Sequence, residues 1–233
     1  YLAAPFVDFL KDNNDPRLSA IAVRYKTAKS GPEQTVSRAT TAPEDQVGMP
    51  LGHDNSTIGT AVTDLGLASF YDFSQVDRRR LVKRDAPMFL LTAAQTNLLL
   101  AEAKFNGWIV GGKTPAEYYA DGIRAHMEQL ASYDAGATVA DADITTYIND
   151  HPLEVGSELE QINTQYWVAS FLNGPEAFAN FRRTAFPDLT PNPFPGKAIT
   201  GDFIRRLTYP VSEISVNSEN VGEAMERMRT EIG

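Results

Sequence analysis

The sequence predicts a mainly α-helical protein in which long irregular loops precede a set of helical hairpins. Three observations support this class. Apolar residues recur at helical spacing over residues 87–105, 114–133 and 158–172. Alanines lie where the paired helices would meet, and small residues let helices approach closely. Residues 13–75, in contrast, are rich in Gly, Pro, Ser and Thr and contain only short β-like runs.

Residues 1–12 are predicted to form an amphipathic helix. The turn-forming sequence DNNDPR ends this helix, with Pro16 as the stop signal. Residues 13–75 contain two β-like runs, LSAIAVRY and TIGTAV, and are predicted to be long irregular loops with room for one hairpin. Loops of this length inside a compact domain are uncommon and often functional. The chain opens on Tyr1, already inside the amphipathic pattern, so we expect a fragment whose beginning, with any targeting segment, is missing.

Residues 87–183 are predicted to hold the helical hairpins. The first of these helices is expected to have Pro87 in its first turn and to carry Met88 and Leu91 on its apolar face. The spacing is looser than a repeat of about 34 residues, so we expect tetratricopeptide-like pairs that stack as an α–α superhelix. Further helices are expected in ADADITTYIND, NGPEAFANFRR and NVGEAMERMRTEI, and the proline-rich tail is expected to wrap the helices. We therefore expect one domain over residues 1–233, divided into 1–86, 87–183 and 184–233.

The stretch GWIVGGKT, residues 107–114, has the glycine and lysine spacing of a phosphate-binding loop. Such a loop joins a buried strand to a helix and needs small residues where its backbone approaches the phosphates. Here a helical pattern precedes the stretch, and bulky residues such as Trp108 occupy its interior. The sequence Thr114-Pro115 with Glu117 is a capping box at the start of a helix. The stretch is therefore predicted to connect two helices, and no nucleotide is expected to bind.

Composition excludes several classes of function. The formal net charge of −9 argues against nucleic acid as a partner, because binding to phosphates needs clustered cations. There is no cysteine, so disulfides, thiolate metal sites and cysteine nucleophiles are absent. The three histidines, His53, His126 and His151, share no metal-ligand spacing, and there is no G-x-S-x-G nucleophile sequence. We expect no catalytic residue, metal or cofactor, although the many carboxylates leave a glycoside hydrolase open as an alternative.

Four sequence motifs occur in a fixed order: APMFLLTAAQTNLLLAEAKFNGW, YYADGI, INTQYWVASFLNGPEAFANFRRTAFPDLTP and RRLTYPVSEISVNSENV. Together they resemble the C-terminal half of the SusD/RagB family, and most closely its SusD-like outer-membrane nutrient-binding lipoproteins. The resemblance covers residues 85–222, and NDPRL and GMPLG nearer the start add weight to it. Two departures are the missing lipidated cysteine and AFANF where the family has WE before the paired arginines.

The resemblance implies a non-catalytic binding protein, surface-exposed at the cell outer membrane, with the anchor segment absent from this chain. Such proteins cap a SusC-like TonB-dependent transporter and hand it oligosaccharides or peptides. The alternative from another class is a tetratricopeptide-like adaptor that binds proteins or peptides on a concave helical face. A nucleotide-hydrolysing enzyme is the least favoured interpretation.

Ligand residues vary among members of this family, so the resemblance assigns none here. Sugar rings pack their C–H faces on aromatic rings, while their hydroxyls need a few oriented polar partners. On that chemistry the candidates are exposed-loop residues, with loop packing as the competing interpretation for each of them. They are His53, Asn55, Phe70, Tyr71, Phe73 and, between two helices, Trp108.

Two groups of cations are interpreted as structural. Arg182 and Arg183 end a short helix, where cations complement the helix dipole, and are expected to fix that helix to the tail near YPVSE. The basic run DRRRLVKRD, residues 77–85, is expected to be solvated or paired within the chain, with an acidic ligand or partner as the alternative.

Overall fold

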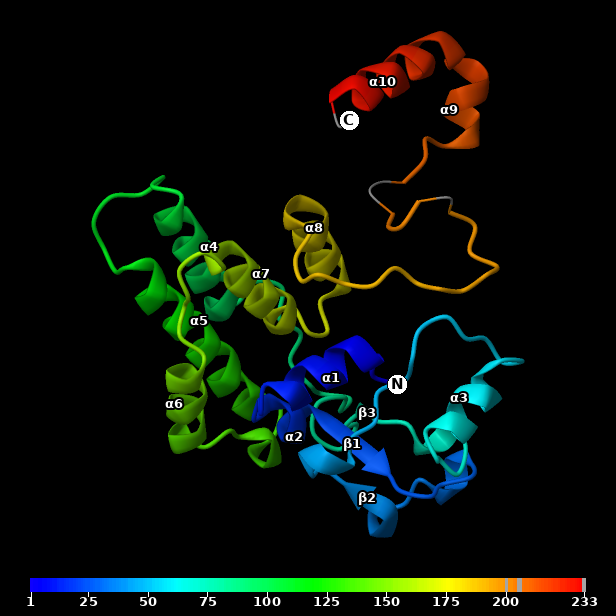
Figure 1. Cartoon of the computed structure of the whole chain (residues 1–233), viewed down its shortest axis with the longest axis vertical. Coiled ribbons are helices and arrows are strands. Elements are labelled where there is room, and N and C mark those ends of the chain that lie inside the picture. Colours follow the sequence, from blue (N-terminus) through cyan, green and yellow to red (C-terminus); the bar gives the residue numbers. More distant parts are fainter. Residues whose placement is uncertain (200, 205–206, 232–233) are drawn as a thin grey trace. The chain divides into compact units, whose positions relative to one another are not determined.

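A computed structural model describes residues 1–199, 201–204 and 207–231 (Figure 1). The described chain is mainly helical, as the sequence predicts, and divides into two compact units, Tyr1–Pro195 and Gly196–Gly233. The finer division of residues 1–233 at positions 86 and 183 stays a prediction.

The first part of the larger unit combines two helices with a small sheet. The predicted first helix is confirmed as α1 (Ala4–Asp12), and α2 (Arg17–Ile21) follows the DNNDPR turn. The sheet has the order β2-β1-β3, with both pairs antiparallel: β1 (Ala22–Tyr25), β2 (Ala39–Thr40) and β3 (Gln75–Val76). Arg24 pairs with Thr40, and Ala22 pairs with Val76. Short 3₁₀ turns lie at Gly31–Glu33, Val36–Arg38, Pro43–Asp45 and Phe70–Asp72.

The run TIGTAV, expected to be β-like, is instead part of helix α3 (Ile58–Asp64). A local turn explains the difference. The Asp54 carboxylate accepts hydrogen bonds from the backbone N–H groups of Ser56 (2.9 Å) and Thr57 (3.0 Å), and the Asp54 carbonyl accepts from Ile58 N–H at 2.9 Å. The turn directs the chain into a helix although Thr, Ile and Val favour strands. The β-like run therefore supplies no strand of the sheet.

The helical hairpins lie between residues 93 and 184 (Figure 1). Helix α4 packs lengthwise against α5 and also contacts α7, which in turn contacts α8, while α6 lies against α5. Their shared core contains Leu98, Ile123, Met127 and Ile162, all nearly or fully buried. The helices are α4 (Ala93–Phe105), α5 (Pro115–Gln129), α6 (Asp141–Asp150), α7 (Glu158–Ala169) and α8 (Gly174–Thr184), with 3₁₀ turns at Leu130–Ser132 and Ala135–Ala137.

Helix α4 begins later than expected. Thr92, not the region of Pro87, caps it: the Thr92 side chain accepts from Gln95 N–H at 3.1 Å and the Gln95 side chain accepts from Thr92 N–H at 3.1 Å. This reciprocal pair satisfies two free N–H groups of the first turn. Met88 and Leu91, expected on the apolar face, are 86% and 75% exposed.

The GWIVGGKT stretch connects two helices, as predicted. Its first glycine, Gly107, follows α4 with φ of 72°, the left-handed conformation that ends many helices. Thr114 caps α5 through the predicted capping box, accepting from Glu117 N–H at 3.2 Å, and Lys113 forms an ion pair with Asp121. A phosphate-binding loop needs a strand where α4 lies, so the nucleotide interpretation has no support in this segment.

The α4–α5 seam depends on a glycine. A Cβ on Gly122 would lie 2.6 Å from Leu98 Cγ and 3.3 Å from the Ala94 carbonyl oxygen. We expect Gly122→Ala to lower the free energy of unfolding by about 1–3 kcal/mol, because a methyl group overpacks the seam. The matched control is Gly59→Ala in α3, where no atom lies within 4 Å, and it should stabilise by up to about 1 kcal/mol. Urea unfolding measures both, and a stabilising Gly122→Ala would contradict the close seam.

The cations at the end of α8 are structural, but their partners differ from those expected. The Arg183 guanidinium pairs with the Glu102 carboxylate of α4 (2.8 Å to Oε2) and donates to Asn163 of α7 at 3.3 Å. Arg182 lies over the Phe178 ring. Arg183 therefore fixes α8 to two other helices of the larger unit, whereas we expected it to bind the tail near YPVSE.

The basic run is paired within the chain, which confirms that interpretation. Asp77 is fully buried and contacts both Arg79 (3.3 Å) and Arg80 (3.4 Å), and Lys83 pairs with Asp134. The smaller unit contains α9 (Val211–Val216) and α10 (Ser218–Glu231), the latter matching the predicted last helix. Ile232 of that prediction, and Arg205 and Arg206 of the RRLTYP motif, lie outside the described residues.

Candidate ligand-binding groove

A groove of about 450 Å³ lies in the larger unit between α1, the loop at Pro50, α7 and residues 187–193 of the proline-rich tail. We call it the Trp167 groove after its largest aromatic side chain. Most of its lining is apolar and includes Phe9 and Leu51, and its polar side chains are Asp8, Asp188 and Thr190. A mainly apolar concavity with a few polar groups is typical of small-molecule sites.

Aromatic packing fixes the indole of Trp167. The ring meets Phe6 edge to face at 5.3 Å between ring centres and Phe9 at 6.0 Å, and Phe6 in turn stacks on Phe171 at 5.2 Å. Trp167 stays half-buried while Phe6 is buried, so α1 holds the indole in place without covering it. Part of a rigid aromatic surface is therefore available in the groove.

The GMPLG sequence, residues 48–52, closes one side of the groove by backbone contact with α1. Ala4 N–H donates to the Met49 carbonyl, and Met49 N–H donates to the Leu2 carbonyl, both at 2.8 Å. Gly48 permits this approach, because a Cβ there would lie 2.4 Å from Ala4 Cα. At the other end of the GMPLG stretch, Gly52 lies against Pro193 of the tail. The two glycines thus join three separate segments into one wall.

The groove has two carboxylates, Asp8 and Asp188. Neither Asp8 nor Asp188 forms an ion pair with any residue that the structure describes. Partial burial, together with the nearby Asp12 charge, raises the pKa of Asp8 above its ordinary value. Both carboxylates, with the Thr190 hydroxyl, are placed to accept hydrogen bonds from a polar ligand.

Buried polar side chains form a cluster with Arg17 of the NDPRL sequence at its centre. Arg17 is fully buried and its Nε donates to both Asp15 oxygens at 2.9 and 3.0 Å. Its terminal nitrogens donate to Gln165 Oε1 at 2.7 Å and to His126 Nδ1 at 3.1 Å. Gln165 Nε2 donates to the Tyr147 hydroxyl at 3.1 Å. A guanidinium only donates, so His126 Nδ1 accepts and its proton lies on Nε2.

This cluster predicts a loss of stability in acid. Burial, followed by the Arg17 charge, holds the pKa of His126 well below its ordinary value. In the unfolded chain a histidine has a pKa of about 6.5, so below that pH the unfolded state binds one more proton than the folded state. Stability therefore falls as the pH falls, by about 2 kcal/mol between pH 6.5 and 5 from this group. Urea unfolding of the protein and of His126→Gln at both pH values measures the difference, and an unchanged pH dependence in the variant would contradict it.

The structure separates the residues that the sequence nominated for ligand binding. His53 and Asn55 are exposed and follow Gly52 in the loop that borders the Trp167 groove. Phe70 is half-buried and packs on Tyr1 at 4.3 Å, and Tyr71, next to it, is 38% exposed.

Phe73 is fully buried, so its ring supports Phe70 at 6.3 Å and is closed to a ligand in this structure. Trp108 is 70% exposed, but it lies in the α4–α5 connection, on the other side of the larger unit from α3 (Figure 1). None of the six lines the Trp167 groove directly, and their role in binding stays a prediction.

Sequence reasoning missed Trp167 and Phe9 as residues that line the groove. Phe9 lies on the predicted apolar face of the first helix, whereas Trp167 lies outside the apolar positions expected for its helix. Both pack, yet both stay half-buried. The available signal was the QYW sequence, in which Tyr166 takes the core position and leaves its neighbour Trp167 turned away from that core.

A family model described as starch-binding, associating with outer membrane, matches residues 1–210. The chain belongs to the SusD-like family. This confirms the resemblance carried by the four motifs, and the mainly helical fold agrees with it. A search of the curated proteins found no match.

Solved structures give the same SusD-like assignment. A chitin-binding protein is 31% identical, with a TM-score of 0.75, and the match covers 97% of this chain and 46% of that one. A SusD homologue from Bacteroides fragilis is 25% identical (TM-score 0.74, coverage 97% and 49%). A chitin-binding SusD homologue from Flavobacterium johnsoniae is 26% identical (TM-score 0.62, coverage 97% and 46%). The chain thus spans about half the length of the SusD-like structures it matches.

Among the described residues, no helix is long and apolar enough to cross a membrane. Nor do the described histidines, aspartates and glutamates form a group of three or more that could hold a metal ion.

Proposed function

We propose that this chain binds oligosaccharides in the Trp167 groove, as the C-terminal part of a non-catalytic SusD-like protein exposed on the outer membrane. One observation carries the proposal: an indole held rigid by Phe6 and Phe9 borders a concavity whose polar groups are two carboxylates and a hydroxyl. A sugar ring presents an apolar C–H face and a rim of hydroxyl donors, which this arrangement complements.

The relatives support the same class of ligand. The matching family is described as starch-binding, and two similar solved proteins are described as chitin-binding. Starch and chitin differ in linkage and substituents but share pyranose rings, so an aromatic platform suits both. We propose a glycan, with no preference between these two from the groove alone.

Delivery of the bound glycan to a SusC-like TonB-dependent transporter is the second part of the proposal. The support is the family description, which places members in association with the outer membrane. The proposed role requires release of an intact ligand. After incubation with the protein, a glycan that binds should therefore be recovered unshortened by chromatography, and shortened products would indicate hydrolysis.

Trp167 provides the direct test. We expect Trp167→Ala to weaken binding of chitin or starch oligosaccharides about tenfold or more, because the loss of an aromatic contact of 1.4 kcal/mol corresponds to a factor of ten. Calorimetry with the chain and with the variant measures the change. Circular dichroism and a melting curve show whether the variant is folded, since Trp167 also contacts Phe6 and Phe9.

Fluorescence localises the ligand, because the chain has two tryptophans. In Trp108→Phe, where Trp167 is the remaining tryptophan, an oligosaccharide should change the emission, and in Trp167→Phe it should not. A response from Trp108 alone would contradict the proposed groove and favour the α4–α5 loop. A response to peptides and to no glycan would favour the tetratricopeptide-like adaptor, whose ligand would contact helix faces.

A further inference from the structure

Two more cavities lie near the Trp167 groove. Phe9 lines both the groove and a second cavity of about 260 Å³. Asn13, Tyr147 and His151 line the second cavity and also a third of about 340 Å³. A residue that lines two cavities lies between them, so the three cavities are neighbours, and together we call them the α1 path.

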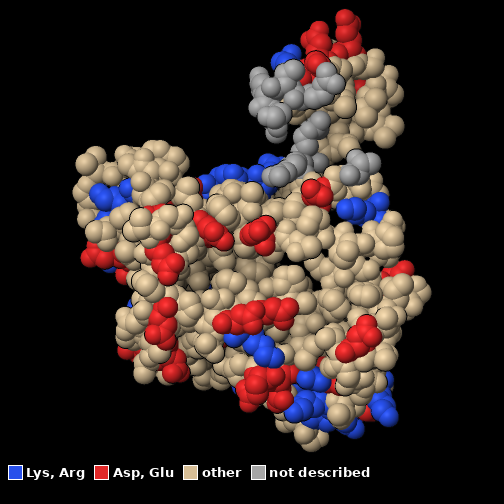
Figure 2. Space-filling model, in the orientation of Figure 1, with Lys and Arg blue, Asp and Glu red and all other residues tan. Residues whose placement is uncertain are grey.

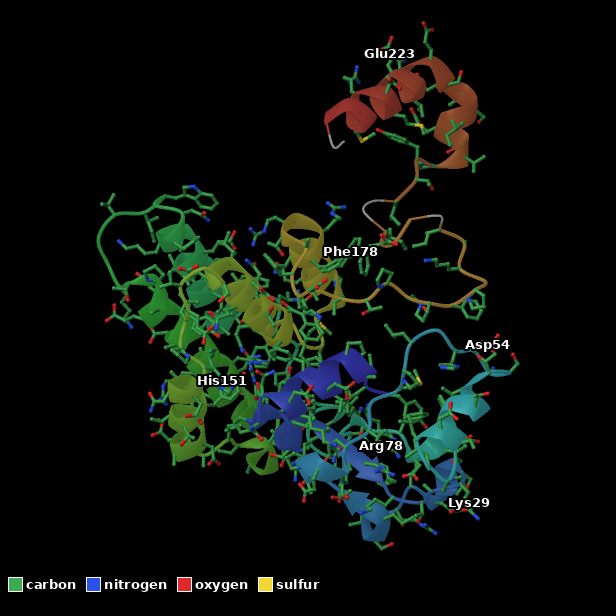
Figure 3. All side chains as sticks on the ribbon, in the orientation of Figure 1. Lys29, Asp54, Arg78, His151, Phe178 and Glu223 are labelled. Carbon is green, nitrogen blue, oxygen red and sulfur yellow. The ribbon has the colours of Figure 1, made fainter. Side chains whose placement is uncertain are left out.

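His151 divides the second cavity from the third and is held in one orientation. Its Nδ1–H donates to the Tyr147 carbonyl at 2.9 Å, and its ring stacks on the Tyr147 ring at 4.2 Å with 25° between the planes. The Arg17 guanidinium of the buried cluster lies 5.5 Å from the centre of the same Tyr147 ring. His151, labelled in Figure 3, is half-buried. Tyr147 covers one face of its ring, so the α1 path contains a second fixed ring of aromatic character.

The charge of the α1 path is of one sign. Glu154 and Glu160 line the second cavity, and Asp143 and Asp150 line the third, in addition to the two carboxylates of the Trp167 groove. Among the described residues, no lysine or arginine lines any of the three cavities. Figure 2 shows acidic side chains gathered on this face, over α1, α6 and α7.

Some acids of the chain are paired with bases, as in Asp72 with Arg24, Asp77 with Arg79 and Glu102 with Arg183. Exposed acids such as Glu44 and Asp64 form no ion pair among the described residues. None of the six carboxylates of the α1 path takes part in an ion pair among the described residues. A neutral glycan in the second or third cavity would displace water from the carboxylates and offer them no positive charge. A cationic ligand would also displace this water but would supply a charged hydrogen-bond donor.

We propose that the second and third cavities bind sugar units that carry free, protonated amino groups, while the neighbouring ring packs in the Trp167 groove. The inference rests on the proposed glycan binding and adds the class of sugar. The ring of such a unit packs against His151, its ammonium group donates to the carboxylates, and its hydroxyls meet the Asn13 side chain.

Calorimetry with three oligosaccharides of equal length tests this: an oligomer of glucosamine, one of N-acetylglucosamine and one of glucose, at pH 6 and two salt concentrations. We expect the glucosamine oligomer to bind at least tenfold more tightly than the acetylated one at low salt. The advantage should shrink at high salt, because the partly exposed charges are screened.

Two double variants, Asp143→Asn/Asp150→Asn and Glu154→Gln/Glu160→Gln, should reduce the advantage of the amino sugar and leave the affinity for the neutral oligomers unchanged. The matched control is Glu44→Gln/Asp64→Asn, which removes the same charge from exposed carboxylates that line none of the three cavities. The control should bind all three oligomers as the unmodified chain does.

The outcomes separate the two proposals. This inference is wrong, and the proposed function stands, if the neutral oligomers bind and the glucosamine oligomer binds no more tightly than they do. The same holds if the glucosamine oligomer binds more tightly but keeps its higher affinity in both double variants. If a lysine-rich peptide binds in a way that the double variants abolish and the glucosamine oligomer does not bind, the α1 path serves a basic peptide. If no oligosaccharide binds, the proposed function fails and this inference fails with it.

Discussion

Replacing the buried Arg17 with methionine should lower the free energy of unfolding by about 3–5 kcal/mol, because removing one partner of a buried ion pair leaves the other charge uncompensated. Arg17 is fully buried, as is its partner Asp15, and the guanidinium also donates to Gln165 and His126. Methionine fills much of the space but donates to none of the three. Urea unfolding at pH 7 measures the loss.

Two further variants identify the cause of that loss. Arg38 pairs with Glu33 at 3.4 Å on the surface, with both side chains more than a third exposed. Arg38→Met should therefore change stability by about 0–1 kcal/mol. The double variant Asp15→Asn/Arg17→Met should be more stable than Arg17→Met alone, since it also removes the unpaired charge. Equal stabilities would mean that lost packing, and not the Asp15 charge, dominates.

Gly48→Ala should cost about 2–3 kcal/mol and also weaken ligand binding. Three backbone atoms lie within 3.1 Å of the position a Cβ would take: Ala4 Cα at 2.4 Å, Ala4 N at 2.8 Å and Ala3 C at 3.1 Å. Backbone atoms cannot turn away as a side chain can, so either α1 or the GMPLG loop must shift. Because both segments line the Trp167 groove, we expect unfolding and calorimetry to report the change together.

The control for Gly48 is Gly174→Ala at the start of α8, where a Cβ would meet no atom within 4 Å. That variant should keep both stability and affinity close to those of the unmodified chain. A Gly48→Ala protein with full affinity would show that the GMPLG loop does not shape the site.

The helices were predictable because their information is local. The capping box at Thr114 and the periodicity of α5 can be read within one stretch, and both agree with the structure. The start of α4 was placed too early because Pro87 suits a first turn, but the competing capping pair of Thr92 and Gln95 fixes the boundary. The strand expected in TIGTAV failed similarly, since the side chain of Asp54 outweighs β-propensity.

The groove was not predictable in this way. Its walls come from residues near 4–9, 50–51, 167 and 187–193, and no single stretch contains the pattern. The sequence did mark two of the supporting parts through the family resemblance, NDPRL and GMPLG, without revealing their roles. In the structure, Arg17 of NDPRL carries the buried cluster, and Gly48 of GMPLG permits contact with α1.

The interior hydrogen bonds of Arg17 have a consequence for recognition. Arg17 can only donate, so it fixes the orientation of the Gln165 amide, whose Nε2 can only donate to the Tyr147 hydroxyl. Tyr147 in turn orients His151, because the two rings stack. A receptor surface supported in this way is pre-organised, so little conformational entropy is lost when a ligand arrives. Such stiffness favours discrimination between stereoisomers that differ at one hydroxyl, since the protein cannot adapt its acceptors to a misplaced donor.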